Sequence, residues 1–504
     1  MLRKLTKCVC LVLGLTAAQH AGAFTLWGPL ETWQTADLDY GTRYFYVDVN
    51  LLTGLGTTEN GGPKNFGEGS RLTTPIVTYA FDATFLNYFG AKGVAAVDAG
   101  MKVLNALPAA SSANLNNFLT EGAEQVNYTA QALGLLDIKS TVMWLMAEHM
   151  GLLGETHVWD LLLRSHYGTA ACDYNYYVVN RNYDPVTYNP SAYVNGRLYG
   201  YYIWDGCPIG VSVGDAIEIP LDATSQGFTA VATPEGLELG GYYLNMTRDD
   251  MGGLKYLYQK GNYVYQGLDS NTVATPFTSS WQAVNTTNEI TGISNFVGVI
   301  GGVEKITFVK VNYDSLVGAA FAPITYTYTI PYVTNSKLSQ LSVTRTINAP
   351  DVIFTAADLI NSEALPNYTA LTRSGTFIQS TYTSPGAGIT PSTINASMVI
   401  VLNNAGPVYW NENPYFMDNE NYYAYPVFNW GSFDGSTNAP IVFPLGSSLA
   451  ELEQEVLQGG ANVPLNPWAP VLNNTTNTTG SGTGTGTGTG SGGASAGVST
   501  PRAR

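Results

Sequence analysis

The pattern of apolar and polar positions predicts a mixture of helices and strands in the first half of this chain of 504 residues. Residues 75–82 alternate in the manner of a strand, and residues 90–107 carry apolar side chains at helical spacing. Residues 140–151 form the most apolar helix that the sequence predicts, and residues 249–258 form a last short helix. Helices and strands are thus expected side by side in this half of the chain.

Beyond about residue 264 the same pattern predicts strands almost alone. Four runs are β-branched or strictly alternating: 306–311, 324–330, 341–347 and 398–402. Such runs, separated by Asn, Gly and Pro, are typical of sandwich-type domains. Residues 473–500 are a Thr/Gly/Ser tract with no core to bury, which indicates a flexible tail.

The start of the chain has the features of a secretory signal peptide. The first seven residues carry three positive charges and no negative one, an apolar run covers residues 8–18, and small residues occupy positions 21–23. The apolar run is shorter than the about 20 residues that cross a bilayer. We therefore expect a secreted, or cell-surface-associated, extracellular protein without a membrane span.

Together these patterns predict an α+β fold in four parts. The expected boundaries are 1–23 for the signal peptide, 24–262 for an α+β domain, 263–472 for one or more mainly antiparallel, sandwich-like β domains, and 473–504 for a disordered low-complexity tail.

Net charge and cysteine content narrow the class of protein. Removal of the signal peptide takes away three positive charges, so the formal net charge changes from −16 to −19. So acidic a surface repels phosphate backbones, and nucleic acid is not an expected partner. Two cysteines remain, Cys172 and Cys207, and a disulfide between them is expected in an exported chain. Closing that long loop would contribute about 3–4 kcal/mol on the chain-entropy model.

Residues 147–157 read AEHMGLLGETH and partly fit the zinc-protease pattern HExxHxxGxxH. In that pattern two histidines one helical turn apart bind zinc, the Glu activates a zinc-bound water, and a Gly lets the chain turn toward a third histidine. Glu148, Gly154 and His157 occupy their positions in the pattern. The first two ligand positions hold Ala147 and Gly151, which cannot bind a metal.

Three stretches, in the same order along the chain, resemble matrixin-like metzincins over roughly residues 70–260. They are the strand 75–82 with the helix from Gly90, the 147–157 segment, and residues 246–258, where a Thr-x-Asp-Asp start precedes a helix ending in Leu-Tyr. The resemblance implies a metalloprotease scaffold on which Glu148 is the base and His157 the third zinc ligand. Met246 is only a loose counterpart of the family's methionine turn. With two of three ligands missing, the resemblance also implies a dismantled zinc site.

Two interpretations of the remaining histidines stay open. In the first, His149, His157 and His166 join a carboxylate in a rearranged zinc site. His149 would point roughly 200° away from the first-ligand position, so that site needs a different geometry. In the second, residues 140–153 are a buried core helix and His157 bonds a backbone carbonyl. We favour the core helix.

A second candidate site is an aromatic stretch near the C-terminus. The candidate ligand-binding residues of this stretch are Trp410, Tyr415 and Tyr422, and Trp430 follows shortly after it. Aromatic faces beside amides and carboxylates are the usual parts of a sugar-binding surface. The carboxylates of the stretch, which suit calcium or a glycosidase pair, are Glu412, Asp418 and Glu420. The competing interpretation is a tyrosine-rich loop packed on a sandwich.

The sequence therefore predicts a non-catalytic binding or structural protein on a degenerate metalloprotease scaffold. Its expected partner is an extracellular protein or polysaccharide, and no cofactor is expected. The alternative is a secreted hydrolase, either a zinc metalloprotease with a rearranged site or a carbohydrate-active or carbohydrate-binding protein. In that case the bound metal would be zinc or calcium. The sequence leaves open whether the chain is an enzyme.

Overall fold

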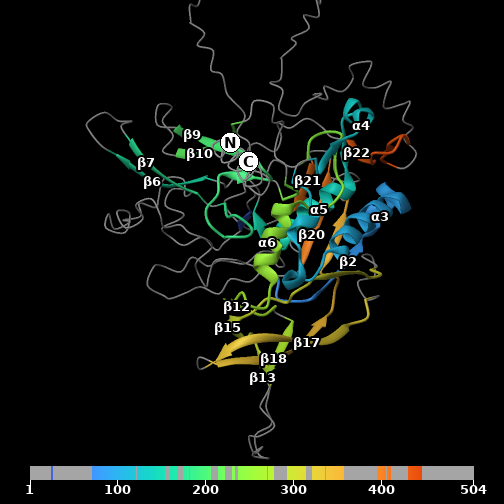
Figure 1. The fold of residues 1–504 in the computed structure, drawn as a ribbon. Helices are drawn as coiled ribbons and strands as arrows, with labels where there is room; N and C mark the ends of the chain where they lie inside the picture. The colour runs from blue at the N-terminus through green and yellow to red at the C-terminus, as the bar shows by residue number, and fades with distance from the viewer. Residues whose placement is uncertain are drawn as a thin grey trace, which may run out of the picture.

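Two large β-sheets, with helices packed on one of them, form the body of the protein (Figure 1). The computed structural model describes residues 24–26, 71–120, 122–153, 159–166, 174–180, 182–205, 214–221, 230–232, 237–269, 271–276, 292–313, 321–334, 337–356, 394, 396–403, 406–409 and 429–444. Its α-helices are α3 (Ala83–Ala106), α4 (Tyr128–Ala132), α5 (Ile138–His149) and α6 (Arg248–Tyr258), with 3-10 turns at Ala110–Ser112 and Leu115–Asn117. Within the described residues, no helix is both long and apolar enough to cross a lipid bilayer.

The five-stranded sheet has the order β16-β2-β19-β20-β21. Its strands are β2 (Ile76–Phe81), β16 (Thr307–Lys310), β19 (Val352–Thr355), β20 (Met398–Asn403) and β21 (Gly406–Tyr409). β16 and β19 both pair with β2 in parallel, β20 continues in parallel, and β21 is an antiparallel edge. α3 follows β2 at once, because the Asp82 carboxylate accepts the Phe85 N–H at 2.8 Å and caps the helix.

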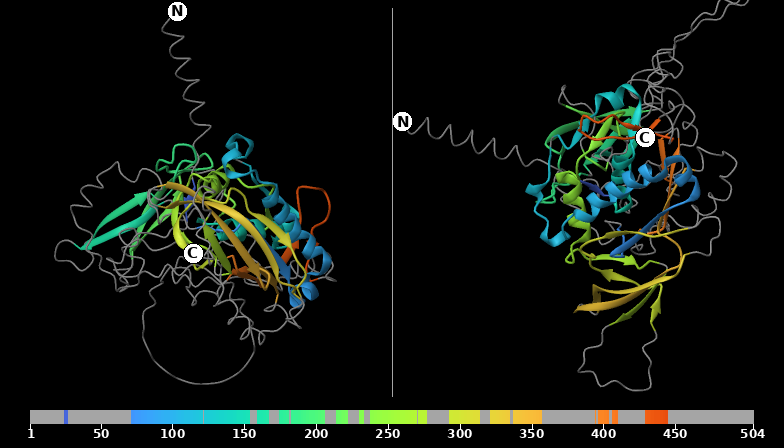
Figure 2. Two further views of the ribbon diagram at one scale, coloured as in Figure 1. Left: turned by 90° about the horizontal axis from the view of Figure 1, so that it is seen from below. Right: turned by 90° about the vertical axis from the view of Figure 1, so that its right-hand side faces the viewer.

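The six-stranded sheet is antiparallel, in the order β12-β15-β17-β18-β13-β14, and lies below the five-stranded sheet in Figure 1 and in the right-hand view of Figure 2. Its strands are β12 (Val264–Gly267), β13 (Thr272–Pro276), β14 (Ile293–Ser294), β15 (Val297–Ile300), β17 (Ile324–Thr334) and β18 (Lys337–Ile347). β17 and β18 form a long hairpin whose alternating sequence gives one buried face and one face of threonines.

Smaller sheets surround these two. They are β23-β22-β4 (Ile441–Val442, Asn429–Ser432, Leu135–Asp137), β10-β9-β8 (Gly214–Pro220, Arg197–Asp205, Tyr193–Val194), β6-β7 (Trp159–His166, Tyr174–Asn180), β11-β3 (Gly241–Tyr243, Glu124–Val126) and β1-β5 (Thr25–Leu26, Leu152–Leu153). The sheets β10-β9-β8 and β6-β7 lie to one side of the body in Figure 1.

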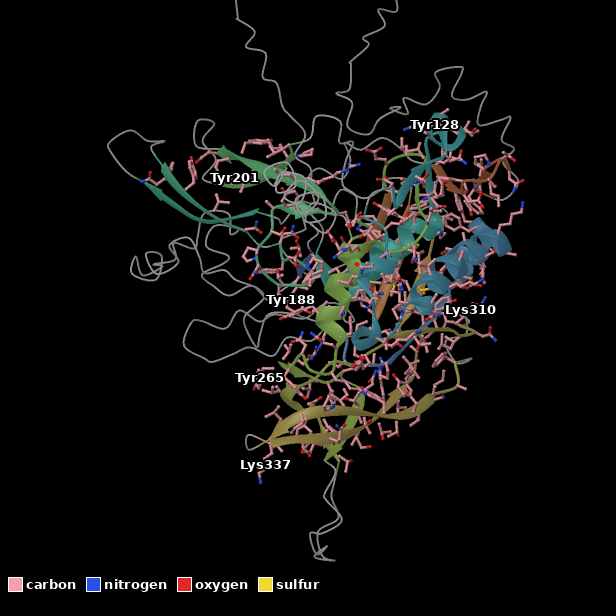
Figure 3. The ribbon with its side chains drawn as sticks, in the orientation of Figure 1. Tyr128, Tyr188, Tyr201, Tyr265, Lys310 and Lys337 are labelled. Carbon is pink, nitrogen blue, oxygen red and sulfur yellow. The ribbon has the colours of Figure 1, made fainter. Side chains whose placement is uncertain are left out.

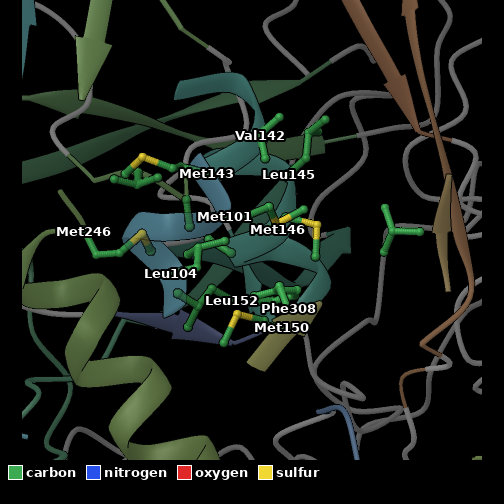
Figure 4. Packing of buried hydrophobic residues seen from close by; sticks show 14 of the residues in the cluster. Met101, Leu104, Val142, Met143, Leu145, Met146, Met150, Leu152, Met246 and Phe308 are labelled. Atoms are coloured by element: carbon green, nitrogen blue, oxygen red, sulfur yellow. The ribbon is translucent and has the colours of Figure 1, made fainter. Parts of the chain in front are cut away.

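The main hydrophobic core lies between α3, α5, α6 and the five-stranded sheet. Methionines of α5 pack there against Met101 and Leu104 of α3 and against Met246, as Figure 4 shows. Gly100 permits this close helix contact, because a Cβ at that position would lie 2.9 Å from the Lys139 carbonyl oxygen of α5. The opposite face of the sheet carries a smaller cluster around Ile353 and Val401.

A buried ion network joins the two large sheets. Arg345 of β18 is fully buried and donates to Asp351 at 2.6 Å and 3.1 Å and to Asp269 at 2.7 Å. Asp351 in turn accepts the Thr78 N–H of β2 at 2.8 Å and its hydroxyl at 2.9 Å. Burial lowers the pKa of Arg345, but the Asp351 hydrogen bonds and the two carboxylate charges outweigh it and raise that pKa. The network therefore fixes the six-stranded sheet on the centre of the five-stranded one.

A second buried arginine is held without a carboxylate partner among the described residues. Arg71 donates to the Gln266 side chain at 2.9 Å and to three backbone carbonyls, those of Leu257, Asn262 and Ile300. Burial lowers its pKa to about 10. Carbonyl dipoles, including one at the C-terminal end of α6, thus replace the counter-ion.

The local elements agree with the sequence analysis, and their assembly differs from it. The strand 75–82 and the helices 90–107, 140–151 and 249–258 are confirmed as β2, α3, α5 and α6. The strands after residue 263 do not form only antiparallel sheets, because β16, β19 and β20 run parallel. They also enclose β2, so the five-stranded sheet extends across the expected 262/263 boundary.

Loss of Arg345 should strongly destabilise the fold. The Arg345→Met variant leaves Asp351 and Asp269 buried without their cation, and we expect the free energy of unfolding to fall by about 3–5 kcal/mol. Lys310→Met is the matched control, because it breaks the half-exposed Lys310–Asp98 ion pair and should cost about 0–1 kcal/mol. Urea unfolding at neutral pH measures both. Equal losses in the two variants would contradict the structural role of the network.

Candidate functional site

The candidate zinc-protease segment begins on α5 and leaves it almost at once. The helix starts where Asp137 accepts the Ser140 N–H at 2.9 Å and its hydroxyl at 2.6 Å. It ends at His149, and Gly151 follows with a φ of 104°, a conformation that favours glycine at the end of a helix. Position 151 therefore lies beyond the helix, whereas the zinc pattern needs it on the helix one turn after position 147.

Two neighbouring positions of the pattern, Ala147 and Glu148, are buried. Ala147 is fully buried in the main core. Glu148 is only 4 % exposed, and its Oε1 accepts the indole N–H of Trp144 at 2.9 Å. Residues i and i+4 of a helix lie on one face, so this bond ties Glu148 to its own helix.

His149 lies in the core and not at a metal site of the described residues. It is 1 % exposed, and its Nε2 is 3.1 Å from the Ala396 carbonyl oxygen just before β20. Burial lowers its pKa to about 4, although the Ala396 hydrogen bond and the Asp351 charge oppose this. The imidazole is therefore neutral at pH 7. Residues 140–149 form the expected core helix, but the expected helix over 140–153 is too long, because residues 152–153 belong to β5.

Most other predicted site residues lie outside the described part of the chain. These are His157, Cys172, Cys207, Trp410, Tyr415 and Tyr422, together with Gly154. His166 is the last residue of β6, paired with Tyr174 of β7. Among the described residues, no three His, Cys, Asp or Glu side chains lie close enough together to hold a metal ion.

Trp430 has a position different from the one predicted. The sequence analysis placed it on a sugar-binding surface, but it is fully buried on β22. Its ring meets Phe89 of α3 edge-on, with ring centroids 6.4 Å apart. β22 pairs in parallel with β4, directly before α5, so Trp430 belongs to the core and not to a surface.

The start of α6 holds a heavily hydrogen-bonded carboxylate. Thr247 and Asp250 form a reciprocal capping box. Asp250 also accepts the backbone N–H groups of Val231 and Ala232, each at 3.0 Å. The Thr-x-Asp-Asp start therefore caps the helix as predicted, and here it also ties down a distant loop.

The sequence analysis missed an exposed apolar face on the sheet β10-β9-β8. In the antiparallel register, Tyr193 pairs with Leu198, and Gly200 pairs with Ile219. Because paired residues share a face, the following side chains lie together: Tyr193, Leu198, Tyr202, Ile219 and Leu221, which are 37–55 % exposed. The opposite face is buried at Val194 and Tyr199, whereas Tyr201 on that face is exposed. Figure 3 shows this sheet at the side of the body, with Tyr201 labelled. β9 has tyrosines on both of its faces, so its sequence does not indicate which face is buried.

Comparison with known proteins gave no match for this chain, whether to a protein-family model, a curated protein or a solved structure. The resemblance to matrixin-like metzincins therefore stays a prediction.

The buried neutral His149 predicts a specific pH dependence. Its pKa is about 4 in the folded protein and about 6.5 in the unfolded chain, so the unfolded chain binds the additional proton as the pH falls. Between pH 7 and pH 5 this should remove about 2 kcal/mol from the free energy of unfolding. In His149→Gln, which keeps a donor for Ala396 and does not titrate, that loss should disappear.

Chemical unfolding of both proteins at each pH gives the comparison. Asp137, whose pKa burial raises to about 6, contributes in the opposite direction in both proteins and cancels in the difference. Identical pH profiles for the two proteins would show that His149 is not buried as described.

Proposed function

We propose that this chain is a secreted or cell-surface-associated protein that binds an extracellular protein and does not catalyse a reaction. It is built on a scaffold that resembles a matrixin-like metzincin. One observation carries the proposal: the helix that would hold the zinc-protease chemistry is used for packing, with Ala147 in the core and Glu148 bonded to Trp144. A Glu without a bound metal has no activated water to use.

The exposed face of β10-β9-β8 supports the binding role. Its exposed residues are tyrosine, leucine and isoleucine, and contiguous exposed apolar residues mark interaction sites. A sugar would need polar groups beside the aromatic rings, whereas aliphatic side chains suit the apolar surface of a protein.

Metal content and peptidase activity test the non-catalytic role. The protein from residue 24 onward, purified without chelator and dialysed against zinc, should hold far less than one zinc per chain by elemental analysis. It should leave a generic peptide library uncleaved, with or without chelator. About one zinc per chain, lost in His157→Ala, together with chelator-sensitive cleavage, would instead establish the rearranged metalloprotease.

The apolar face can be tested before any partner is identified, with the neutral dye Nile red as probe. The double variant Tyr202→Ser, Leu221→Ser should lower the dye's fluorescence enhancement at least about twofold, because it removes two of the most exposed apolar side chains of the patch. The control Leu338→Ser removes an exposed apolar residue of similar size from β18 and should change little. Unchanged fluorescence in the double variant, or retention on a polysaccharide column that the double variant loses, would overturn the proposed protein-binding face.

A further inference from the structure

One long strand of the six-stranded sheet has an edge that is free of strand partners among the described residues. β17 pairs with β18 along its whole length, from Ile324 to Thr334. On its other side only Tyr332 and Val333 are paired, with β15. No described residue pairs with 324–330 on that side. β17 is therefore an internal strand at one end and an edge strand at the other.

The backbone groups on this edge can be identified from the ladder. The Pro331 carbonyl accepts the Gly301 N–H at 2.8 Å, and Val333 pairs with Val299, so these odd-numbered residues face away from β18. Backbone direction alternates along an antiparallel strand. Thr325, Thr327 and Thr329 thus present their N–H and C=O groups at the free edge.

The sequence of this edge is symmetric about its middle residue. Residues 324–330 read ITYTYTI, which is the same in both directions about Thr327. Two copies of this strand, set antiparallel about a two-fold axis at Thr327, would bring Ile opposite Ile, Thr opposite Thr and Tyr opposite Tyr. Opposed aromatic and threonine pairs are favourable across strands.

Side-chain orientation agrees with this symmetry. Tyr326 and Tyr328 point to the inner face, where their hydroxyls donate to the carbonyls of Ile76 and Thr73, each at 3.0 Å. The threonines of β17 are exposed on the outer face. Like residues on like faces are what a two-fold axis perpendicular to the sheet requires.

The edge also lacks the features that normally prevent such pairing. Natural edge strands carry lysine, proline or a bulge to block addition of another strand. Residues 324–330 have no charge, no proline and unbroken register with β18. Lys337, which Figure 3 shows at the tip of the hairpin, and Pro331 lie beyond the free segment.

We propose that two copies of this chain associate through residues 324–330 of β17, in antiparallel register about Thr327. Thr327 then forms a hydrogen-bonded pair with Thr327 of the partner subunit, and Thr325 with Thr329 of the partner subunit. Tyr326 lies opposite Tyr328 of the partner subunit. The two six-stranded sheets become one continuous sheet, with the threonines of both copies on one surface.

The first test compares two lysine variants. Thr327 and Thr344 share a hydroxyl hydrogen bond at 3.0 Å on the same face, so Thr327→Lys and Thr344→Lys lose the same bond and gain the same charge. Only Thr327 lies on the free edge, where a lysine would face its own counterpart across the axis. By sedimentation at micromolar concentrations the wild type and Thr344→Lys should approach twice the mass of the chain. Thr327→Lys should dimerise at least about tenfold more weakly, since like charges directly opposite each other are destabilising.

Cysteine cross-linking tests the register. Opposed Cα atoms in a hydrogen-bonded antiparallel pair are about 5.5 Å apart, within the range that a disulfide spans. Under mild oxidation Thr327→Cys should form a covalent dimer, with the linked peptide identified by mass spectrometry, whereas Thr344→Cys and Thr325→Cys should not link to themselves. A mixture of Thr325→Cys and Thr329→Cys should link.

Each remaining outcome would overturn the proposal. A wild type that stays monomeric at all concentrations excludes the dimer. A dimer that Thr327→Lys and Thr344→Lys weaken equally places the interface elsewhere, and circular dichroism of both variants shows whether either fails to fold.

Discussion

The fixed contact on which the rest of the molecule depends is the buried guanidinium of Arg345 between Asp351 and Asp269. A charge can be buried only where its partners are already in place, so this contact tolerates one arrangement of the two sheets and penalises others. Asp351 also bonds Thr78 on β2, an internal strand of the five-stranded sheet, and so extends the constraint to that sheet. Arg71 secures the other end of the junction through carbonyls of α6 and β15. Apolar packing alone would allow the sheets to slide.

The sequence predicted what is local and missed what is not. Thr247 caps α6, as the Thr-x-Asp-Asp start predicted, and apolar spacing located α3 and α5. The caps Asp82 and Asp137 were not predicted, and α3 begins at Ala83, before its predicted start at Gly90. The insertion of β2 between β16 and β19 leaves no local trace, because a buried parallel strand and an antiparallel one have similar composition. The expectation of mainly antiparallel strands in the second half therefore holds for the six-stranded sheet, and β16, β19 and β20 are the parallel exceptions.

The candidate site shows the same limit. Sequence spacing placed Glu148 and Ala147 on a helix and found two ligand positions empty, and the structure adds that the helix stops before the second of them. The burial of Trp430 against Phe89 was missed, because an aromatic among Asn and Gly in sequence gives no sign of its distant partner. The exposed face of β10-β9-β8 was also missed. Which face of a tyrosine-rich strand is exposed depends on which face the rest of the chain covers, and the local sequence does not show this.

The place of β2 between two late strands has a consequence for how the chain matures. Ile76 pairs with Thr307, and Tyr79 with Val352, so both neighbours of this early strand are synthesised long after it. Contacts between residues so far apart form slowly, because a long loop must close before they contribute. β2 therefore stays without its two neighbouring strands until these emerge, although α3 can already pack on α5. A chain that stops between these two regions would carry intact helix caps and still lack the five-stranded sheet on which its helices pack.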